Sequence, residues 1–212
     1  MSTGTRDGWT PEVWPSDRAA SSTLKAWLDE SDGAEFYGLD LDFGKADLSR
    51  IDLADAWLTG STFGETVLRN AQLVHAHCEG ANFAVADLMG ADLTGVIGHA
   101  ATFSGARLVG ADLNAAEFWD ADFSRADLTG ANLGDGSFAR ADLRGASLRK
   151  ATADKAILRE ASLDGVEVAG MTGSVIGPIK VTLDGEPALI DDDELVAWFR
   201  HRGATVARFR RA

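Results

Sequence analysis

Large apolar residues recur at every fifth position along most of the chain. The register runs from Phe43 to Val168 without an insertion, and Leu or Phe occupies all but four of its 26 centres. Ala stands two residues before the centre in 19 of these 26 repeats. A period of five matches neither the 3.6-residue period of a helix nor the 2-residue period of a strand. The pattern therefore indicates an internal structural repeat.

A second period of 20 residues is superimposed on the first. Phe occupies positions 43, 63, 83, 103 and 123, whereas Leu occupies positions 48, 68, 88, 108, 128 and 148. Every fourth centre therefore lies above its predecessor, and each pentapeptide forms one side of a square coil. The centre and the small residue point inward, because a second large side chain would not fit a narrow, close-packed interior. The pattern predicts an all-β solenoid.

The units "ADLTG", "ANFAV", "ADLRG" and "ARLVG" resemble those of pentapeptide-repeat proteins, whose motif is A(D/N)LXX. The resemblance extends over residues 41–170. It implies a right-handed quadrilateral β-helix of about six and a half coils, roughly 31 Å long at about 4.8 Å per coil. The fold alone does not define a function, because repeat folds bind many partners.

Residues 1–40 are expected to form an N-terminal extension that covers the first coil. The segment "SSTLKAWLDESDG" predicts a short capping helix with Ser21 or Ser22 as its N-cap. Three apolar side chains share one face of this helix at i, i+3 and i+4 spacing: Leu24, Trp27 and Leu28.

Residues 171–212 are expected to form a C-terminal module of a hairpin and a helix. "IKVTLDGEPALI" predicts a hairpin that turns at Asp184 and Gly185, "DDDELVAWFRHRG" predicts a helix, and "ATVARFRR" is expected to add a strand to the hairpin. The module either caps the last coil or joins two rods as a homodimer. The second reading rests on a resemblance to the terminal helix of the MfpA and Qnr fluoroquinolone-resistance groups. It implies that three side chains are buried between chains: Leu195, Trp198 and Phe199.

The four sides of a coil are numbered from their centres, so that Phe43, Leu48, Leu53 and Leu58 mark the first to the fourth side of the first coil. The residue before each centre points outward, and carboxylates are frequent there on the second and third sides. The resulting candidate partner-binding edge consists of Asp47, Asp52, Asp87, Asp92, Asp112 and Asp127. A net charge of −13 argues against direct binding of nucleic acid. In the quinolone-resistance proteins an acidic rod occupies the DNA site of a type II topoisomerase. The resemblance therefore implies DNA gyrase or topoisomerase IV as a protein partner. The alternative is that Asp at this position is only a preference of the motif.

The fourth side predicts a different contact surface. Its outward positions include Trp57, His77, Ile97 and Trp119, and exposed apolar patches of this kind mark interfaces. An interaction scaffold for an unrelated protein partner would use this side. The alternative is that the N-terminal segment folds back and covers it.

Enzymatic chemistry finds little support in the sequence. A third reading places a metal between His77, Glu79 and His99, as a two-histidine, one-carboxylate set. No nucleophile–base pair or phosphate-binding loop is found, so we expect a non-enzymatic protein without a cofactor. A single cysteine, no apolar run of about 18 residues and no secretory signal predict a cytoplasmic protein without a membrane contact.

Overall fold

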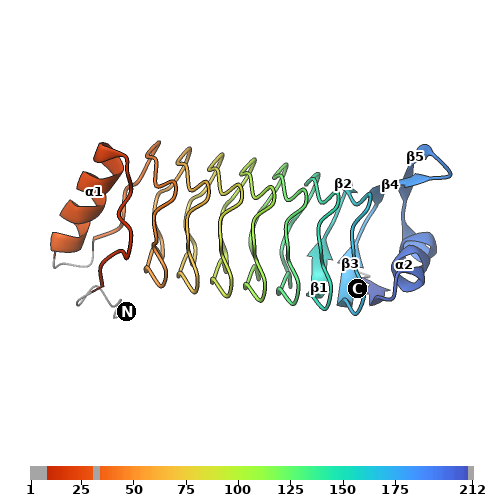
Figure 1. Cartoon of the computed structure of the whole chain (residues 1–212). Helices are drawn as coiled ribbons and strands as arrows, with labels where there is room; N and C mark the ends of the chain where they lie inside the picture. Colours follow the sequence, from red (N-terminus) through yellow and green to blue (C-terminus); the bar gives the residue numbers. More distant parts are fainter. Residues whose placement is uncertain (1–8, 31–33, 210–212) are drawn as a thin grey trace.

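The computed structural model describes residues 9–30 and 34–209. Coils of twenty residues stack into a rod (Figure 1). Helix α1 (Arg18–Asp29) lies at one end of the rod, and helix α2 (Asp192–His201) lies at the other.

The coils are joined by parallel pairing between residues twenty positions apart. Trp57 pairs with His77, for example, and Asp92 pairs with Asp112. Most of this pairing consists of single-residue bridges, because a turn follows each one. Longer strands occur toward the C-terminal end: β1 (Thr152–Ile157), β2 (Ala161–Ser162) and β3 (Thr172–Ile176). The β-solenoid predicted from the period is therefore the observed architecture.

The corners of the coil are four-residue turns that begin at a centre, except at residues 153–156, which belong to β1. At the first corner the carbonyl of Phe43 accepts a hydrogen bond from the N–H of Ala46 at 3.2 Å, and Lys45 has a φ of 62°. The third residue of every turn has a positive φ throughout the coils, as in type II turns. Glycine adopts this conformation without strain, but Val85 adopts it as well, with a φ of 60°.

The core is a set of vertical columns of like side chains. Adjacent Phe rings of the first side, from Phe43 to Phe123, are stacked with their centroids 4.8 Å apart. Gly98 interrupts the fourth column, and the ring of Phe118 occupies the space that results. All 26 centres apart from this glycine contribute buried apolar side chains, which confirms the predicted register.

Helix α1 covers the first coil, but it begins earlier than the sequence predicted. Its N-cap is Asp17, not Ser21 or Ser22, because the Asp17 carboxylate accepts the N–H of Ala20 at 2.7 Å. The buried ring of Trp27 lies edge-on to that of Phe36, with the centroids 5.0 Å apart.

The C-terminal module contains the predicted hairpin, formed by β4 (Ile179–Leu183) and β5 (Glu186–Ile190). The last strand, β6 (Thr205–Arg208), does not join this hairpin, so that prediction is wrong. It pairs in parallel with β3, and the two sheets have the orders β1-β3-β6 and β2-β4-β5. The reason is that α2 returns the chain to the open edge of β3, where backbone groups need partners.

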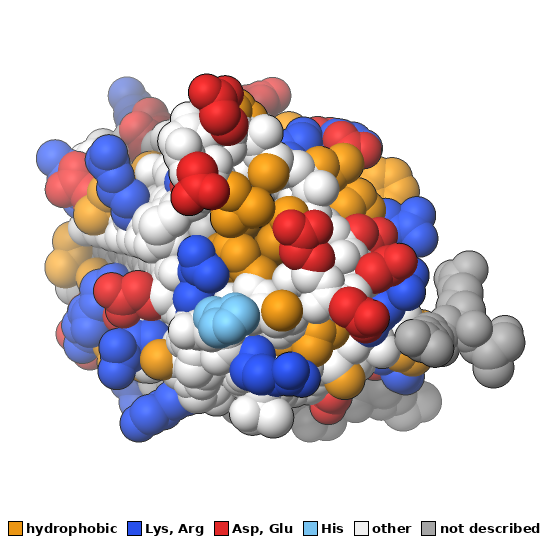
Figure 2. Space-filling model, turned by 90° about the vertical axis from the view of Figure 1, so that its right-hand side faces the viewer, with side chains coloured by type: hydrophobic (Ala, Val, Ile, Leu, Met, Phe, Trp, Pro, Cys, Tyr) orange, Lys and Arg blue, Asp and Glu red, His pale blue; other side chains and the backbone are white. Residues whose placement is uncertain are grey.

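The apolar stripe of α2 faces the end of the rod. Leu195 and Phe199 are fully buried, and Trp198 is 6% exposed. The stripe thus covers the last coil of its own chain, which is the first of the two alternatives that the sequence leaves open, and a homodimer stays a prediction. The outer surface of this end still shows hydrophobic side chains surrounded by charged ones (Figure 2). Among the described residues, no helix has the length and apolar character needed to span a bilayer.

Candidate protein-binding surfaces

The outward Asp residues form hydrogen bonds with the backbone at the corners of the coil. A carboxylate oxygen of Asp52 accepts the backbone N–H of Ala54 at 3.1 Å, and Asp92 accepts that of Thr94 at 2.9 Å. All six Asp residues of the predicted edge make this bond to the residue two positions on. Asn82 and Asn132 make the same bond with their amide oxygens, which explains why the repeat accepts either residue. One carboxylate oxygen of each Asp therefore makes a hydrogen bond that stabilises the corner of the coil.

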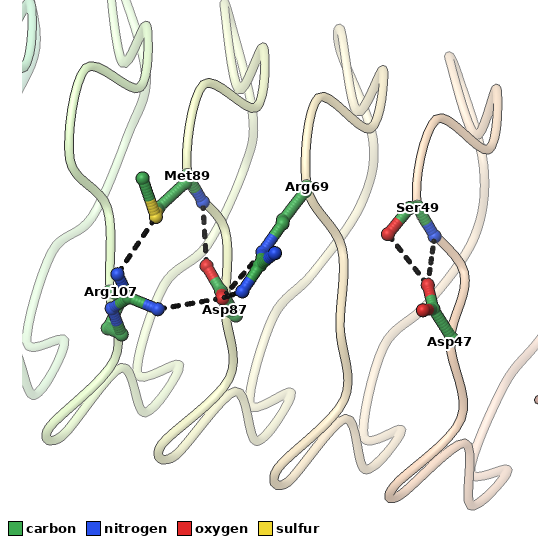
Figure 3. Close-up of polar contacts among 6 residues, drawn as sticks. All are labelled: Asp47, Ser49, Arg69, Asp87, Met89 and Arg107. Carbon is green, nitrogen blue, oxygen red and sulfur yellow. Dashed lines mark hydrogen bonds and ion pairs between the residues drawn. The ribbon is translucent and has the colours of Figure 1, made fainter.

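The second side of the rod is not a row of unpaired carboxylates. Asp87 lies between two guanidinium groups from the flanking coils, with Arg69 at 2.7 Å and Arg107 at 2.9 Å (Figure 3). Its hydrogen bond raises the pKa of Arg69. The negative charge of Asp87 is therefore balanced within the chain.

Residues 9–14 of the N-terminal extension also lie along the second side. Val13 pairs with Asp47 in antiparallel fashion, and the indole of Trp9 donates to the carbonyl of Ser49 at 2.9 Å. Asp47 itself accepts hydrogen bonds from the N–H and hydroxyl of Ser49 (Figure 3). Residues 9–14 thus cover part of the second side of the first coil, not the fourth side.

The third and fourth sides carry the unbalanced charge. In the first five coils these two sides comprise residues 51–60, 71–80, 91–100, 111–120 and 131–140, which contain one Arg, Arg140 at the end of the last segment, and no Lys. The same segments contain eight acidic residues: Asp52, Asp55, Glu79, Asp92, Asp112, Glu117, Asp120 and Asp135. Only two of the eight pair with a Lys or Arg, Asp120 with Arg140 and Asp135 with Lys155 of the next coil. We call this surface the acidic wall.

Of the six Asp residues of the predicted edge, only Asp87 forms an ion pair among the described residues, and the edge stays a prediction as a binding site. Asp52, Asp92 and Asp112 of the third side belong to the acidic wall, and they have no Lys or Arg partner in the described chain. Asp47, Asp87 and Asp127 belong to the second side, where the Arg residues also lie. Counting charges by side of the coil, instead of following one edge, would have located the acidic wall from the sequence.

Aromatic rings form an exposed column along the fourth side. Trp57 stacks on His77 with the centroids 4.0 Å apart, and His99 stacks on Trp119 at 5.2 Å. Trp57 and Trp119 are 37% and 44% exposed, and Ile97 lies half-buried between the two pairs. Glu35 and Tyr37 of the N-terminal extension contact Trp57, since Glu35 accepts the indole N–H at 3.2 Å and the ring of Tyr37 stacks on that of Trp57, yet both tryptophans stay partly exposed.

The structure does not assemble the predicted metal set. His77 Nδ1 lies 3.6 Å from Glu79, but His99 is directed to Glu117 at 3.1 Å. No group of three His, Cys, Asp or Glu side chains in residues 9–30 and 34–209 could hold a metal ion. Burial acts to raise the pKa of Glu79, but hydrogen bonds from its own backbone, Thr59 and His77 outweigh burial and lower it. Both histidines therefore serve in ring stacks and carboxylate contacts.

The repeat defines the family of the protein. The chain belongs to the pentapeptide repeat family, whose model matches eight copies over residues 46–77, 68–97, 99–135 and 137–168. Members of this family form a right-handed quadrilateral β-helix. A comparison with curated protein sequences finds no match.

Solved structures of other pentapeptide repeat proteins are similar to parts of the chain. HetL, which is involved in heterocyst differentiation regulation in Nostoc sp. strain PCC 7120, is 29% identical over 71% of this chain and 80% of its own, with a TM-score of 0.29. A protein from the Arabidopsis thaliana thylakoid lumen is 26% identical over 61% of this chain and 77% of its own, with a TM-score of 0.39. A trypsin-treated form of QnrB1, a plasmid-mediated fluoroquinolone resistance protein, is 17% identical over 78% of this chain and 95% of its own, with a TM-score of 0.39.

Proposed function

We propose that this protein acts without catalysis, by binding a protein that presents a basic surface to the acidic wall. The observation that supports the proposal is the one-sided charge of the rod, since the acidic wall has eight acidic residues and one basic residue, Arg140. The first and second sides of the same coils have six acidic residues and five basic ones. A field of one sign steers a partner of opposite charge and fixes its orientation.

The aromatic column lies within the same surface and supplies a second element of an interface. Trp57 and Trp119 are rigid, partly exposed side chains on the fourth side. Tryptophan is among the residues that contribute most to binding when a partner excludes water from it. Charge on the third side and aromatic rings on the fourth side would thus serve orientation and affinity, respectively.

DNA gyrase or topoisomerase IV is the specific partner that we propose to test. A surface that accepts duplex DNA has to be basic, because the duplex carries one charge per roughly 1.7 Å of its axis. The acidic wall would compete with DNA for such a surface. Binding should weaken with salt, since exposed charges are screened beyond about 8 Å at physiological ionic strength.

The experiment compares two triple variants that change charge without changing the corner hydrogen bond. Asp52→Asn, Asp92→Asn and Asp112→Asn remove three charges from the acidic wall, and Asn makes the same bond at positions 82 and 132. Asp42→Asn, Asp122→Asn and Asp142→Asn remove three charges from the first side, where the Asp residues make the same bond. Gyrase supercoiling and direct binding to the enzyme are measured with each protein.

We expect the acidic-wall triple to lose gyrase inhibition and binding at least tenfold, while the first-side triple behaves as the wild type. Equal loss in both triples would show that net charge matters and the acidic wall does not. If the wild type neither binds gyrase nor changes supercoiling, the topoisomerase proposal is wrong.

The alternative is a scaffold that contacts its partner through the aromatic column alone. For any partner identified, Trp57→Ser with Trp119→Ser would then abolish binding, and the acidic-wall triple would leave it unchanged.

A further inference from the structure

A groove lies where the fourth side of the last coils meets the C-terminal module. Its volume is about 460 Å³. The coils contribute Trp119 and Ile157 to its lining, and the module contributes Ile176 and Phe209. All four apolar side chains are partly exposed in the chain. The groove is therefore an open apolar surface in the size range of ligand sites.

The aromatic wall of the groove is held in place. Trp119 donates its indole N–H to Ser137 Oγ at 2.6 Å, and the ring of His99 stacks on it at 5.2 Å. A fixed ring loses little side-chain entropy when a ligand packs against it.

Arg159 differs from the other cations around the groove. Four neighbouring cations each have a carboxylate partner: Arg140 with Asp120, Lys155 with Asp135, Lys180 with Glu160, and Arg208 with Asp192. Arg159 lines the groove and has no carboxylate within 4.0 Å among the described residues. Its guanidinium is available to a carboxylate from outside the chain.

Asp191 places a carboxylate in the same groove as the guanidinium of Arg159. It is the N-cap residue of α2, but its side chain makes no capping hydrogen bond. It forms no ion pair with a described residue and lines the groove together with Arg159. Its carboxylate can accept an N–H from a ligand.

We propose that this groove binds the C-terminal residue of a polypeptide whose last side chain is apolar. Such a residue has a carboxylate for Arg159, a backbone N–H for Asp191 and a side chain for the apolar lining formed by Trp119, Ile157, Ile176 and Phe209. An inorganic anion would leave the apolar lining unused, and a fatty acid would leave Asp191 without a donor. A terminal residue combines the three groups on neighbouring atoms, and it differs from a free amino acid in having an uncharged backbone N–H and a chain that continues beyond the groove. The groove shares Trp119 with the surface proposed to bind a basic partner, but the proposal does not use the charge of the acidic wall.

The test is a titration of ¹⁵N-labelled protein, followed at the indole N–H signals of its six Trp residues. The signal of Trp119 is assigned with Trp119→Phe. The probes are the pentapeptide Gly-Ser-Gly-Ser-Phe with a free carboxylate, the same peptide with a terminal amide, and free phenylalanine. We expect the acid peptide to shift the Trp119 signal in a saturable way and the amide to bind at least tenfold more weakly.

Two variants separate the groove from general charge effects. Arg159→Gln should reduce the affinity for the acid peptide at least tenfold. Arg149→Gln, which removes a cation that pairs with Glu167 on the second side, should leave it unchanged. Absence of saturation at millimolar peptide, equal binding of acid and amide, or wild-type affinity in Arg159→Gln would each overturn the proposal. Binding of free phenylalanine as tight as that of the peptide would assign the groove to an amino acid instead.

Discussion

The ring of Phe118 fills the space that Gly98 leaves in the fourth column of the core. A Cβ atom at position 98 would lie 2.4 Å from Cε1 of Phe118, which is closer than two carbon atoms can approach. The two residues are twenty positions apart and occupy the same column in consecutive coils. A small residue in one coil is therefore compensated by a large one in the next.

This relationship predicts strong coupling between the two positions. Gly98→Ala should destabilise the protein by about 1–3 kcal/mol, because the ring has to move out of a well-packed core. Phe118→Leu should also destabilise it, and the double variant should cost less than the sum of the two single changes. Urea unfolding of the four proteins measures the coupling. Additive effects would show that Phe118 does not fill the space beside Gly98.

The register of the core could be predicted from the sequence because the position of a residue within the five-residue period determines whether its side chain points into the core. Position 98 is a core position by its phase alone, although glycine gives no apolar signal there. The stacking of coils then follows from the period of 20 without any knowledge of long-range contacts.

The two ends of the chain could not be predicted in the same way, because each is placed by contacts that occur once. The N-cap at Asp17 depends on one hydrogen bond, and the pairing of Val13 with Asp47 depends on the path of a non-repetitive segment. β6 joins β3 because α2 reverses the chain at that point. No periodic pattern in the sequence indicates these three contacts.

The candidate site was predicted in part for a related reason. The sequence shows which Asp side chains point outward, but their ion pairs depend on long side chains from neighbouring coils. Arg69 and Arg107 reach Asp87 from flanking coils, so a column that looks acidic in the sequence is partly neutral in the structure (Figure 3).

Val85 provides a test of the corner geometry. It is a β-branched residue with a φ of 60°, and its side chain is 62% exposed. Left-handed backbone costs roughly 1–2 kcal/mol in a residue with a Cβ, and little packing is lost on removal of this side chain. Val85→Gly should therefore stabilise the protein by about 0.5–1 kcal/mol in urea unfolding.

Gly105 is the matched position one coil later, with a φ of 65°. Gly105→Val should destabilise the protein by a similar amount. A loss of stability in Val85→Gly would show that the corner does not hold residue 85 in the left-handed conformation.

Cys78 should be unreactive in the folded protein. Burial, with a smaller effect from the charge of Glu79, raises the pKa of its thiol well above the usual range. Because the thiolate is the reactive form, we expect no reaction with a disulfide reagent at pH 8 in the native state and complete reaction in guanidinium chloride. Rapid native labelling would place Cys78 outside the core.

The same shift has a consequence for stability at high pH. The unfolded thiol ionises near its ordinary pKa of about 8.5, whereas the folded thiol stays protonated. The stabilisation that results from the buried thiol is therefore complete below pH 8.5 and declines as the pH rises above it. Unfolding of the wild type and Cys78→Ala as a function of pH isolates this contribution.

Trp198 is expected to hold the C-terminal module on the rod. Its ring is buried, lies 5.1 Å from that of Phe199, and is covered by the guanidinium of Arg202 at 4.0 Å. Trp198→Glu should remove about 3–5 kcal/mol of packing and place a charge in the last coil. Because contacts in a solenoid are local, the module should open while the coils stay folded.

Hydrogen exchange with mass spectrometry measures this effect, with Trp57→Glu as the control at a partly exposed tryptophan. We expect faster exchange in α2 and β6 of Trp198→Glu and unchanged exchange over residues 41–130. Protection of α2 at the wild-type level would contradict the prediction that Trp198 holds the C-terminal module against the last coil.

The oligomeric state provides the last test of the C-terminal stripe. Leu195, Trp198 and Phe199 would join two chains only by leaving the core of their own chain, where they are 0%, 6% and 0% exposed. We therefore expect light scattering at tens of micromolar to give the mass of one chain, 22.4 kDa. A dimer in the wild type that becomes a monomer in Trp198→Glu would contradict this prediction and restore the stripe as an interface. A dimer that persists in Trp198→Glu would place the contact elsewhere, for which the exposed Leu189 of β5 is the first position to change.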